Sequence, residues 1–209
     1  MKKAKSSKAW IKDHINDFFV KQANKEGYRS RAAYKLIEIS RRDYLLKPGM
    51  TVVDLGATPG GWSQVAANKV GWSGRVFSLD MLEMKALPNV TFIQGNFEEE
   101  DTLIELRKKL GERPVDLVIS DMSPNISGIV ISDQARGMRL AELALNFSIE
   151  QLNSGGNFLV KVFQGSGFEQ FMYTMRTSFK QVVTRKPRAS RGRSNEIYLL
   201  GLNKHGKVP

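Results

Sequence analysis

The central part of the chain is built from short apolar runs that alternate with segments of helical spacing. The runs cover residues 51–55, 75–80, 90–93, 115–120 and 157–162. Nearly continuous apolar runs are typical of strands that are buried on both faces, as in a parallel sheet with helices on each side. The sequence therefore predicts one α/β domain with a Rossmann-like, mostly parallel sheet.

Two further segments with strand character, residues 181–185 and 196–202, lie near the C-terminus and are separated by a basic loop. We expect them to pair as a hairpin, which gives a seven-stranded sheet with an antiparallel C-terminal strand. Residues 134–152 carry apolar side chains at helical spacing and are followed by a Ser-Gly-Gly stop. Residues 30–42 are predicted to form a helix with one apolar and one charged face.

Composition excludes several kinds of chemistry. The 209 residues include no cysteine and only two histidines, His14 and His205, so we expect no disulfide, no metal site and no Ser-His-Asp triad. The N-terminal segment lacks the apolar run of a signal peptide, and no stretch approaches the roughly 20 apolar residues of a membrane span. These features favour a soluble, cytoplasmic protein over a mitochondrial precursor, because the basic run is short and rich in lysine. We expect a monomer.

Positive charge is concentrated at the two ends of the chain. The formal net charge is +11, with +8 in residues 1–47, −4 in residues 48–179 and +7 in residues 180–209. Basic segments attract polyanions through counterion release, which indicates a nucleic-acid partner. Solvated basic tails are the alternative interpretation. An anionic membrane surface is less favoured, since neither segment has a long apolar face beside its charges.

A glycine-rich turn, Asp54-Leu-Gly56-Ala-Thr-Pro-Gly60-Gly61-Trp62, follows the first predicted strand. Glycine at such a place lets the backbone turn tightly and approach a ligand closely. The turn is neither the dinucleotide pattern G-x-G-x-x-G nor a P-loop, which disfavours a phosphate cradle. Asp54 would repel a pyrophosphate but could hold the ammonium group of a ligand. We therefore take Asp54, Gly56, Gly60 and Trp62 as candidate cofactor-binding residues.

Three more candidates follow the next two predicted strands. Asp80 ends the second strand, 24 residues after Gly56, where a carboxylate accepts hydrogen bonds from ribose hydroxyls in Rossmann-like folds. Asn96 and Phe97 follow the third strand and offer an amide and an aromatic edge to an adenine. Each signal alone is also compatible with ordinary structure. Their order and spacing together favour S-adenosylmethionine, an adenosine with a charged amino-acid tail, as the cofactor.

Several motifs follow one another along nearly the whole chain, from about Trp10 to Leu202. They are residues 54–63, Ser120-Asp-Met-Ser-Pro-Asn125, Leu159-Val-Lys-Val-Phe-Gln-Gly165, Arg193-Ser-Asn-Glu-Ile-Tyr198 and the preceding Tyr28-Arg-Ser-Arg-Ala-Ala-Tyr-Lys-Leu36. Together they resemble the motifs of FtsJ/RrmJ-type ribose 2′-O-methyltransferases. We expect a methyltransferase domain at residues 29–203, preceded by a basic segment at 1–28 and followed by a tail at 204–209.

The resemblance implies a substrate, the 2′-hydroxyl of a uridine ribose in 23S ribosomal RNA within the assembled large subunit. Transfer RNA or another RNA is the alternative substrate. The basic N-terminal segment, the helix at 30–42 and the loop at 185–193 are expected to form a groove for the RNA backbone. Trp10, Tyr28 and Tyr34 are candidates for base stacking, with packing as the ordinary alternative. Two other classes are a non-catalytic RNA-binding protein and a nucleotide-dependent dehydrogenase, the latter disfavoured by the missing G-x-G-x-x-G.

The family's signature is a Lys-Asp-Lys-Glu tetrad, which the resemblance places on Lys35, Asp121, Lys161 and Glu196. Residue patterns support two of these positions. Asp121 ends the fourth predicted strand and Lys161 interrupts the apolar fifth strand, both at the carboxyl edge where open α/β sheets bind ligands. A buried ammonium must be paired or must lose its proton. The ordinary alternatives are a Lys161–Asp121 salt bridge, a Glu196–Arg193 pair and a solvated Lys35.

The methyl group of a sulfonium is already activated, so the enzyme has to align a hydroxyl and remove its proton. We expect Lys161 to be the base, since burial, the sulfonium charge and Lys35 all favour its neutral form. Asp121, which we also expect at the cofactor site, and Glu196 would orient the lysines and the hydroxyl.

Two positions depart from the family pattern. Asn96 stands where the family often has Asp, and we expect this to change cofactor affinity, because an amide accepts a hydrogen bond from adenine more weakly. Thr58 in the glycine turn is expected to have little consequence.

Overall fold

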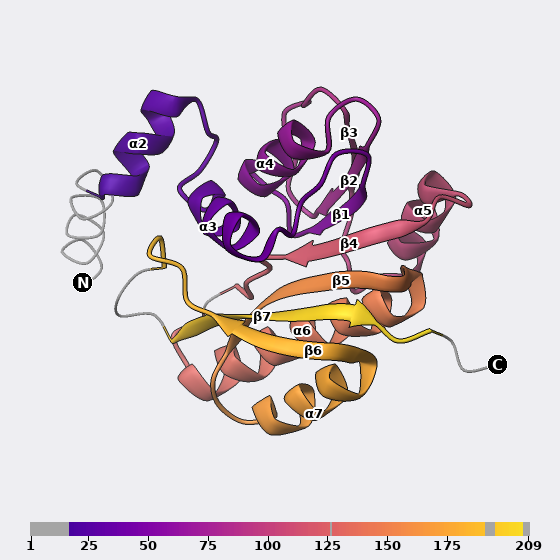
Figure 1. Ribbon diagram of the computed structural model, residues 1–209. Coiled ribbons are helices and arrows are strands. Elements are labelled where there is room, and N and C mark those ends of the chain that lie inside the picture. Colours follow the sequence, from indigo (N-terminus) through magenta and orange to yellow (C-terminus); the bar gives the residue numbers. More distant parts are fainter. Residues whose placement is uncertain (1–16, 126, 191–194, 207–209) are drawn as a thin grey trace.

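The computed structural model describes residues 17–125, 127–190 and 195–206, which form a seven-stranded sheet with helices on both faces (Figure 1). The strands are β1 (Thr51–Leu55), β2 (Arg75–Asp80), β3 (Val90–Gln94), β4 (Val115–Ser120), β5 (Leu152–Phe163), β6 (Phe179–Arg185) and β7 (Glu196–Lys204). The helices are α2 (Phe18–Glu26), α3 (Ala33–Asp43), α4 (Gly61–Val70), α5 (Glu100–Leu110), α6 (Val130–Gln151) and α7 (Phe168–Ser178). The order across the sheet is β3-β2-β1-β4-β5-β7-β6. Neighbours from β3 to β5 are parallel, and β7 is antiparallel to both β5 and β6, so the predicted fold class is confirmed.

The predicted strand boundaries agree with the structure to within two residues except in β5. This strand begins at Leu152, five residues before its predicted start. Its pairing with β4 shifts register between Val115 and Leu117, and Gly155 in the same stretch has a φ of 83°. The irregular start of β5 therefore has no continuous apolar pattern that would reveal it. Helix α6 begins at Val130, four residues earlier than predicted.

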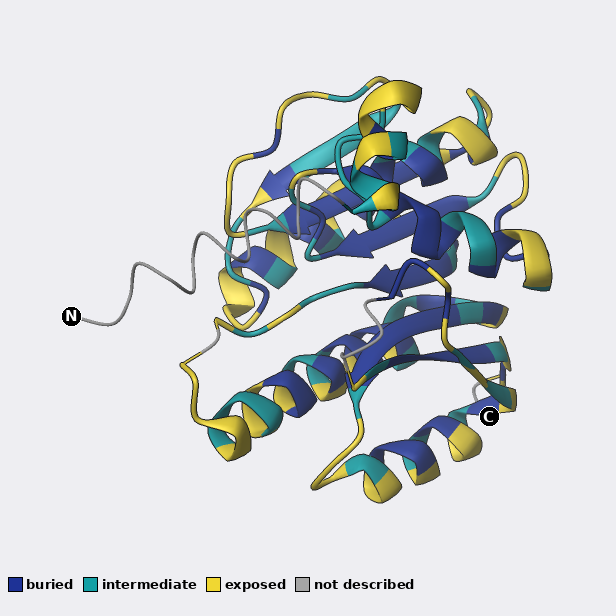
Figure 2. Cartoon of the chain, turned by 90° about the vertical axis from the view of Figure 1, so that its left-hand side faces the viewer, coloured by how far each residue is buried: buried dark blue, intermediate teal, exposed yellow. Residues whose placement is uncertain are grey.

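Two apolar cores lie on opposite faces of the sheet. Helices α5, α6 and α7 cover one face, where Phe147 is buried, and α3 and α4 cover the other, where Leu36 is buried. In β1, Val53 belongs to the first core and Val52 to the second, as the alternation of side chains along a strand requires. Figure 2 shows the buried strands between helices with exposed outer faces. None of the helices in the described ranges is long and apolar enough to cross a membrane.

The topology gathers charged residues at one edge of the sheet. Asp80 ends β2, Asp121 directly follows β4, and Lys161 lies near the end of β5, so all three lie at the carboxyl ends of parallel strands. Strand β7 runs the opposite way, and its first residue, Glu196, pairs with Phe163 near the end of β5. The antiparallel strand therefore starts where the parallel strands end.

Helix α3, which carries Lys35, is held near both of its ends. Trp62 in α4 donates a 2.8 Å hydrogen bond from Nε1 to the carbonyl of Ala32, the residue before the helix. At the other end, Arg185 of β6 donates hydrogen bonds of 2.6 and 2.8 Å to the two carboxylate oxygens of Asp43, a bidentate geometry that fixes orientation as well as distance. These contacts position Lys35 relative to the sheet.

The charged face predicted for α3 is only partly exposed to solvent. Arg31 forms a 3.2 Å ion pair with Asp17, which precedes α2. Glu38 accepts a 2.9 Å hydrogen bond from the backbone N–H of Arg188 in the loop after β6. The face therefore binds two other segments of the chain, and its exposed basic part lies at the C-terminal end, where Arg42 is exposed.

Replacing Trp62 with Phe tests the anchoring of α3. The variant keeps an aromatic ring in the core but removes the donor to the Ala32 carbonyl, so the free energy of unfolding should fall by about 1–2 kcal/mol in urea titrations. The control is Trp72→Phe, because Trp72 is 88% exposed and its replacement should change the free energy by less than about 0.5 kcal/mol. Equal losses in the two variants would contradict this anchoring role.

Candidate active site

Four charged side chains meet at the carboxyl edge of the sheet. Lys161 Nζ lies 3.1 Å from Asp121 Oδ1. Lys35 Nζ lies 2.9 Å from Glu196 Oε1 and 3.9 Å from Asp121 Oδ2. None of the four side chains is more than 16% exposed. The structure thus brings together all members of the predicted tetrad, and Lys35 is a buried part of it rather than a solvated helix charge.

Lys161 is oriented by oxygen atoms on more than one side. Its Nζ donates a 2.7 Å hydrogen bond to the main-chain carbonyl of Asp121 and another to the hydroxyl of Ser123, in addition to its ion pair with the Asp121 carboxylate. The Lys161–Asp121 salt bridge considered as the ordinary alternative is therefore present. It is part of a larger cluster and not an isolated pair at a strand end.

The carboxyl group of Asp121 is held in its ionised form. Burial alone would raise its pKa, but the charges of Lys161 and Lys35 and the hydrogen bonds it accepts outweigh burial and lower the pKa below its usual value. One of these bonds comes from the Tyr198 hydroxyl at 2.8 Å. Burial and the charge of Asp121 raise the pKa of Tyr198 well above its usual value, so this hydroxyl remains a donor.

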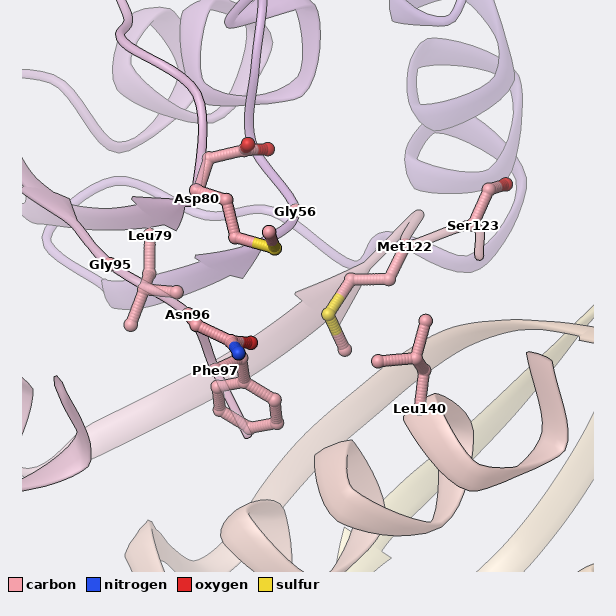
Figure 3. Close-up of a pocket in the computed structure, with 10 residues that line it drawn as sticks. Gly56, Leu79, Asp80, Gly95, Asn96, Phe97, Met122, Ser123 and Leu140 are labelled. Atoms are coloured by element: carbon pink, nitrogen blue, oxygen red, sulfur yellow. The ribbon is translucent and has the colours of Figure 1, made fainter. Parts of the chain in front are cut away.

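A pocket of about 440 Å³ lies beside the cluster, at the ends of the strands and against α6. The residues that line it are Gly56, Leu79, Asp80, Met81, Gly95, Asn96, Phe97, Met122, Ser123 and Leu140. In Figure 3, Asn96 and Phe97 lie on one side of the space, and Met122 and Leu140 on the other. Because Ser123 also accepts the hydrogen bond from Lys161, the pocket and the charged cluster are adjacent. A mostly apolar cavity with a few polar groups is typical of a small-molecule site.

The carboxylate of Asp80 lies at the rim of this pocket and is held by the backbone. One of its carboxylate oxygens accepts a hydrogen bond from the backbone N–H of Thr58, and the other from that of Leu82, both at 2.9 Å. Each carboxylate oxygen has further acceptor capacity. The side chain is therefore fixed in orientation and can still accept hydrogen bonds from a ligand.

Asn96 and Phe97 also line the pocket, but both have structural partners as well. The Asn96 amide accepts a 3.1 Å hydrogen bond from the backbone of Glu98 and donates one of 3.3 Å to Glu99. Phe97 is buried and packs edge-on against Phe147, with ring centres 5.8 Å apart. These contacts hold the loop after β3 in a fixed position against α6.

The glycine turn leaves no room for side chains. Gly56 has a φ of 77°, and a Cβ atom there would lie 2.5 Å from Met122 Cγ. Gly60 has a φ of 104°, and a Cβ atom there would lie 2.8 Å from both Arg29 Nη1 and Met84 Sδ. Gly56 therefore opens the pocket wall itself, whereas Gly60 allows the turn to pack against Arg29.

Asp54 lies beneath the turn and is not part of the pocket wall. It is 1% exposed, and its Oδ2 accepts a 2.6 Å hydrogen bond from the hydroxyl of Ser63. Its Oδ1 has no hydrogen-bond partner among the described residues. Burial raises the pKa of Asp54 to about 7, helped by the charges of Asp121 and Asp80 and opposed by the bond from Ser63. A positively charged ligand group close to this carboxyl would relieve its cost of ionisation.

The side chain of Trp62 packs inside the protein and does not face the pocket. Its side chain is buried between α3 and α4, and its ring centre lies 5.8 Å from that of Tyr198. The side chain is therefore directed into the core. Its backbone belongs to the first turn of α4, whose N-cap residue, Gly60, makes no side-chain cap hydrogen bond, while the backbone of Ser63 in the same turn interacts with Asp54.

Three residues that position the site were not singled out from the sequence. Tyr198 follows Glu196 by two residues in β7 and is the cross-strand partner of Lys161, a placement that strand alternation could have indicated once the pairing was known. Ser123 gave no signal beyond its place in a motif. Arg29 donates hydrogen bonds of 2.7 and 2.8 Å to two carbonyl groups of the loop after β2.

Arg193, considered as a partner of Glu196, lies outside the described residues.

A comparison with protein families decides what kind of site this is. The model of the FtsJ-like methyltransferase family matches residues 28–204. The chain belongs to this family. The predicted resemblance is thereby confirmed, and the charged cluster beside a ligand pocket is part of a methyltransferase fold. No group of three or more acidic or histidine side chains within the described ranges is placed to hold a metal ion.

Relatives of this FtsJ-like methyltransferase match it over almost their full length. A protein from Nitrosospira multiformis named ribosomal RNA large subunit methyltransferase E is 70% identical over 98% of this chain and 99% of its own length. A protein of the same name from Methylobacillus flagellatus is 61% identical with the same coverage. A solved structure of a ribosomal RNA methyltransferase from Plasmodium falciparum is 32% identical, with a TM-score of 0.76 over 86% of this chain and 100% of that chain.

The raised pKa of Asp54 predicts a specific dependence of stability on pH. The ordinary value of this carboxyl is 3.8 and the folded value is about 7, so between them the folded state binds more protons at this site and loses stability as the pH rises. The Asp54→Asn variant cannot ionise at this position. The difference in the free energy of unfolding between variant and wild type should therefore grow in favour of the variant from about pH 4 to about pH 7. It should change by up to roughly 4 kcal/mol over this range and stay constant at higher pH. Urea unfolding at several pH values measures the difference, and a difference independent of pH would refute the assignment.

Proposed function

We propose that this FtsJ-like methyltransferase transfers a methyl group from S-adenosylmethionine to the 2′-hydroxyl of a uridine ribose in 23S ribosomal RNA of the large ribosomal subunit. The observation that carries the reaction is the buried cluster of Lys161, Asp121, Lys35 and Glu196 directly beside a ligand pocket. The names of the close relatives support the substrate.

The residues of the pocket fit such a cofactor. Asp80 has acceptor capacity for the two ribose hydroxyls, and Asn96 and Phe97 are placed to border the adenine. The uncapped N-terminus of α4 suits the carboxylate of an amino acid. Asp54 beneath the turn and Asp121 beside the pocket do not line it, but their negative charges would favour a positively charged group in its vicinity. When bound, the cofactor supplies a methyl group already activated on a sulfonium.

Lys161 is proposed as the base that takes the proton of the ribose hydroxyl. A lysine acts as a general base only through its neutral amine. Asp121 and Ser123 hold the Lys161 amine at 3.1 Å from the carboxylate and in hydrogen-bond contact with the hydroxyl. Glu196 holds Lys35 at 2.9 Å, so Lys35 remains beside the reacting hydroxyl and offsets the negative charge that develops on its oxygen.

The RNA backbone is proposed to follow the exposed basic end of α3 and the loop after β6. Arg41, Arg42 and Arg188 border one surface hollow there. Tyr34 is buried and its hydroxyl donates a 2.8 Å bond to Glu26, so it packs rather than stacks on a base. Trp10 and residues 191–194, also expected at the RNA surface, lie outside the described residues.

The proposal extends to the domain organisation, the oligomeric state and the location of the protein. Residues 29–203 form the methyltransferase domain, with the basic segment 1–28 before it and the tail 204–209 after it. We propose that the protein acts as a monomer. A cytoplasmic location follows from a ribosomal substrate in a bacterial cell such as those of the relatives.

The Lys161→Ala variant should lose methyl transfer by at least about 100-fold, because general-base catalysis is worth roughly that much or more. Transfer of labelled methyl from S-adenosylmethionine to isolated large subunits, free ribosomal RNA and bulk transfer RNA measures the reaction. Lys161→Arg should be equally inactive, since a guanidinium stays charged and cannot act as a base. Lys180→Ala, at an exposed position in β6, is the control. Retained activity in Lys161→Ala would refute the role of the base, and label on transfer RNA alone would change the substrate.

The double variant Arg41→Ala/Arg42→Ala should weaken binding of RNA without affecting the cofactor. Each lost phosphate contact lowers the slope of log affinity against log salt by about 1, so filter-binding at several salt concentrations measures the effect. The control is Lys108→Ala/Lys109→Ala, which removes the same charge from exposed positions of α5. Identical salt slopes for the two double variants would place the RNA elsewhere.

A further inference from the structure

A second pocket lies next to the first, beyond Ser123. It has a volume of about 720 Å³ and is lined by Ser123, Pro124, Val130, Asp133, Gln134, Phe163 and Asn195. Ser123 borders both pockets, and its hydroxyl accepts the hydrogen bond from Lys161 Nζ. The proposed general base therefore lies next to both pockets.

We propose that this second pocket receives the base of the nucleotide whose ribose is methylated, an inference that rests on the proposed function. Phe163 follows Lys161 by two residues in β5, so both side chains lie on the same face of the strand. Lys161 Nζ lies 6.0 Å from the centre of the Phe163 ring. A base bound at this ring has its own ribose within reach of Lys161, since the sugar is bonded directly to the base.

The apolar part of the pocket suits the face of a nucleobase. Phe163 offers an aromatic ring, and base–aromatic stacking is the usual way in which proteins hold a base that is out of its stack. Val130, which lines the pocket, is 68% exposed. Its apolar side chain is therefore available to pack against the face of a base.

The polar part of the pocket suits the edge of a base. Within the described ranges the side-chain amide of Gln134 makes no hydrogen bond, and its oxygen lies 3.1 Å from where a Cβ atom on Gly165 would be. Glycine at this position therefore gives the amide its space. A side-chain amide has donors and an acceptor, and it can therefore pair with the edge of a uracil, which offers one N–H donor between two carbonyl acceptors. Asn195, the residue before β7, places a second amide in the same wall.

The wall of the pocket is preformed rather than loose. The carboxylate of Asp133 accepts hydrogen bonds from the backbone of Ser127 at 2.9 Å, from its hydroxyl at 2.7 Å and from the backbone of Gly128 at 3.1 Å. These bonds tie the loop before α6 to the first turn of that helix. Because the loop is already held in place, binding costs little conformational entropy for ordering it, which favours a specific ligand.

Steady-state methylation of large subunits by Phe163 and Gln134 variants tests the pocket. Phe163→Leu keeps apolar volume but removes the ring, and kcat/KM for RNA should fall roughly 5- to 100-fold, the range expected for one lost stacked base. Phe163→Tyr keeps the ring and should lose clearly less. The dissociation constant of S-adenosylmethionine, measured by calorimetry, should stay the same in both variants.

Gln134→Leu should also lower kcat/KM for RNA, because it removes the amide that pairs with the base edge. Gln151→Leu is the matched control, since it makes the same change at the far end of the same helix and should leave the kinetics unchanged. Unchanged kcat/KM in Phe163→Leu and Gln134→Leu, equal losses in the Leu and Tyr variants of Phe163, or weakened cofactor binding would each overturn the inference. A wild-type protein that methylates no RNA would instead refute the proposed function itself.

Discussion

The buried carboxylate of Asp121 is the interaction on which the rest of the site depends. It lies between the ammonium groups of Lys161 and Lys35 and accepts the hydroxyl of Tyr198. A buried charge is tolerated only with partners, and loss of one partner leaves the others uncompensated at a cost of about 3–5 kcal/mol. With Glu196 included, the cluster holds equal numbers of positive and negative groups. The proposed catalysis and the stability of this edge of the sheet therefore rest on the same contacts.

An antiparallel last strand is what completes this cluster. Parallel strands deliver residues at their carboxyl ends, which accounts for Asp121 and Lys161. Strand β7 enters the same edge from its N-terminal end, so that Glu196 and Tyr198, two residues apart, lie on one face of it, with Tyr198 opposite Lys161. Lys35 comes from a helix outside the parallel core, and its place depends on the contacts that hold α3 at both ends.

The sequence predicted those parts of the structure that have a local signal. The apolar runs located the strands, the strand ends located Asp80 and Asp121, and an ammonium inside an apolar run marked Lys161. Helical spacing identified the charged face of α3 but could not tell that it packs against other segments, so Lys35 was recognised through the family resemblance alone. The sequence also could not predict that the Trp62 side chain points into the core or that Asp54 is buried. Both features depend on how α3 and α4 pack on the sheet.

The charges around the first pocket also bear on which ligand it holds most tightly. Asp54, Asp80 and Asp121 lie close enough for the last two to raise the pKa of the first, and such mutual repulsion is relieved by a positive charge placed among them. A cofactor that bears a sulfonium brings that charge, whereas its demethylated product bears a neutral sulfur. Since Lys161 and Lys35 already compensate Asp121 from the other side, the repulsion remains at the buried carboxyl of Asp54. A positive charge on a ligand bound near Asp54 would relieve it, so the electrostatics of this side of the site favour a ligand that carries such a charge.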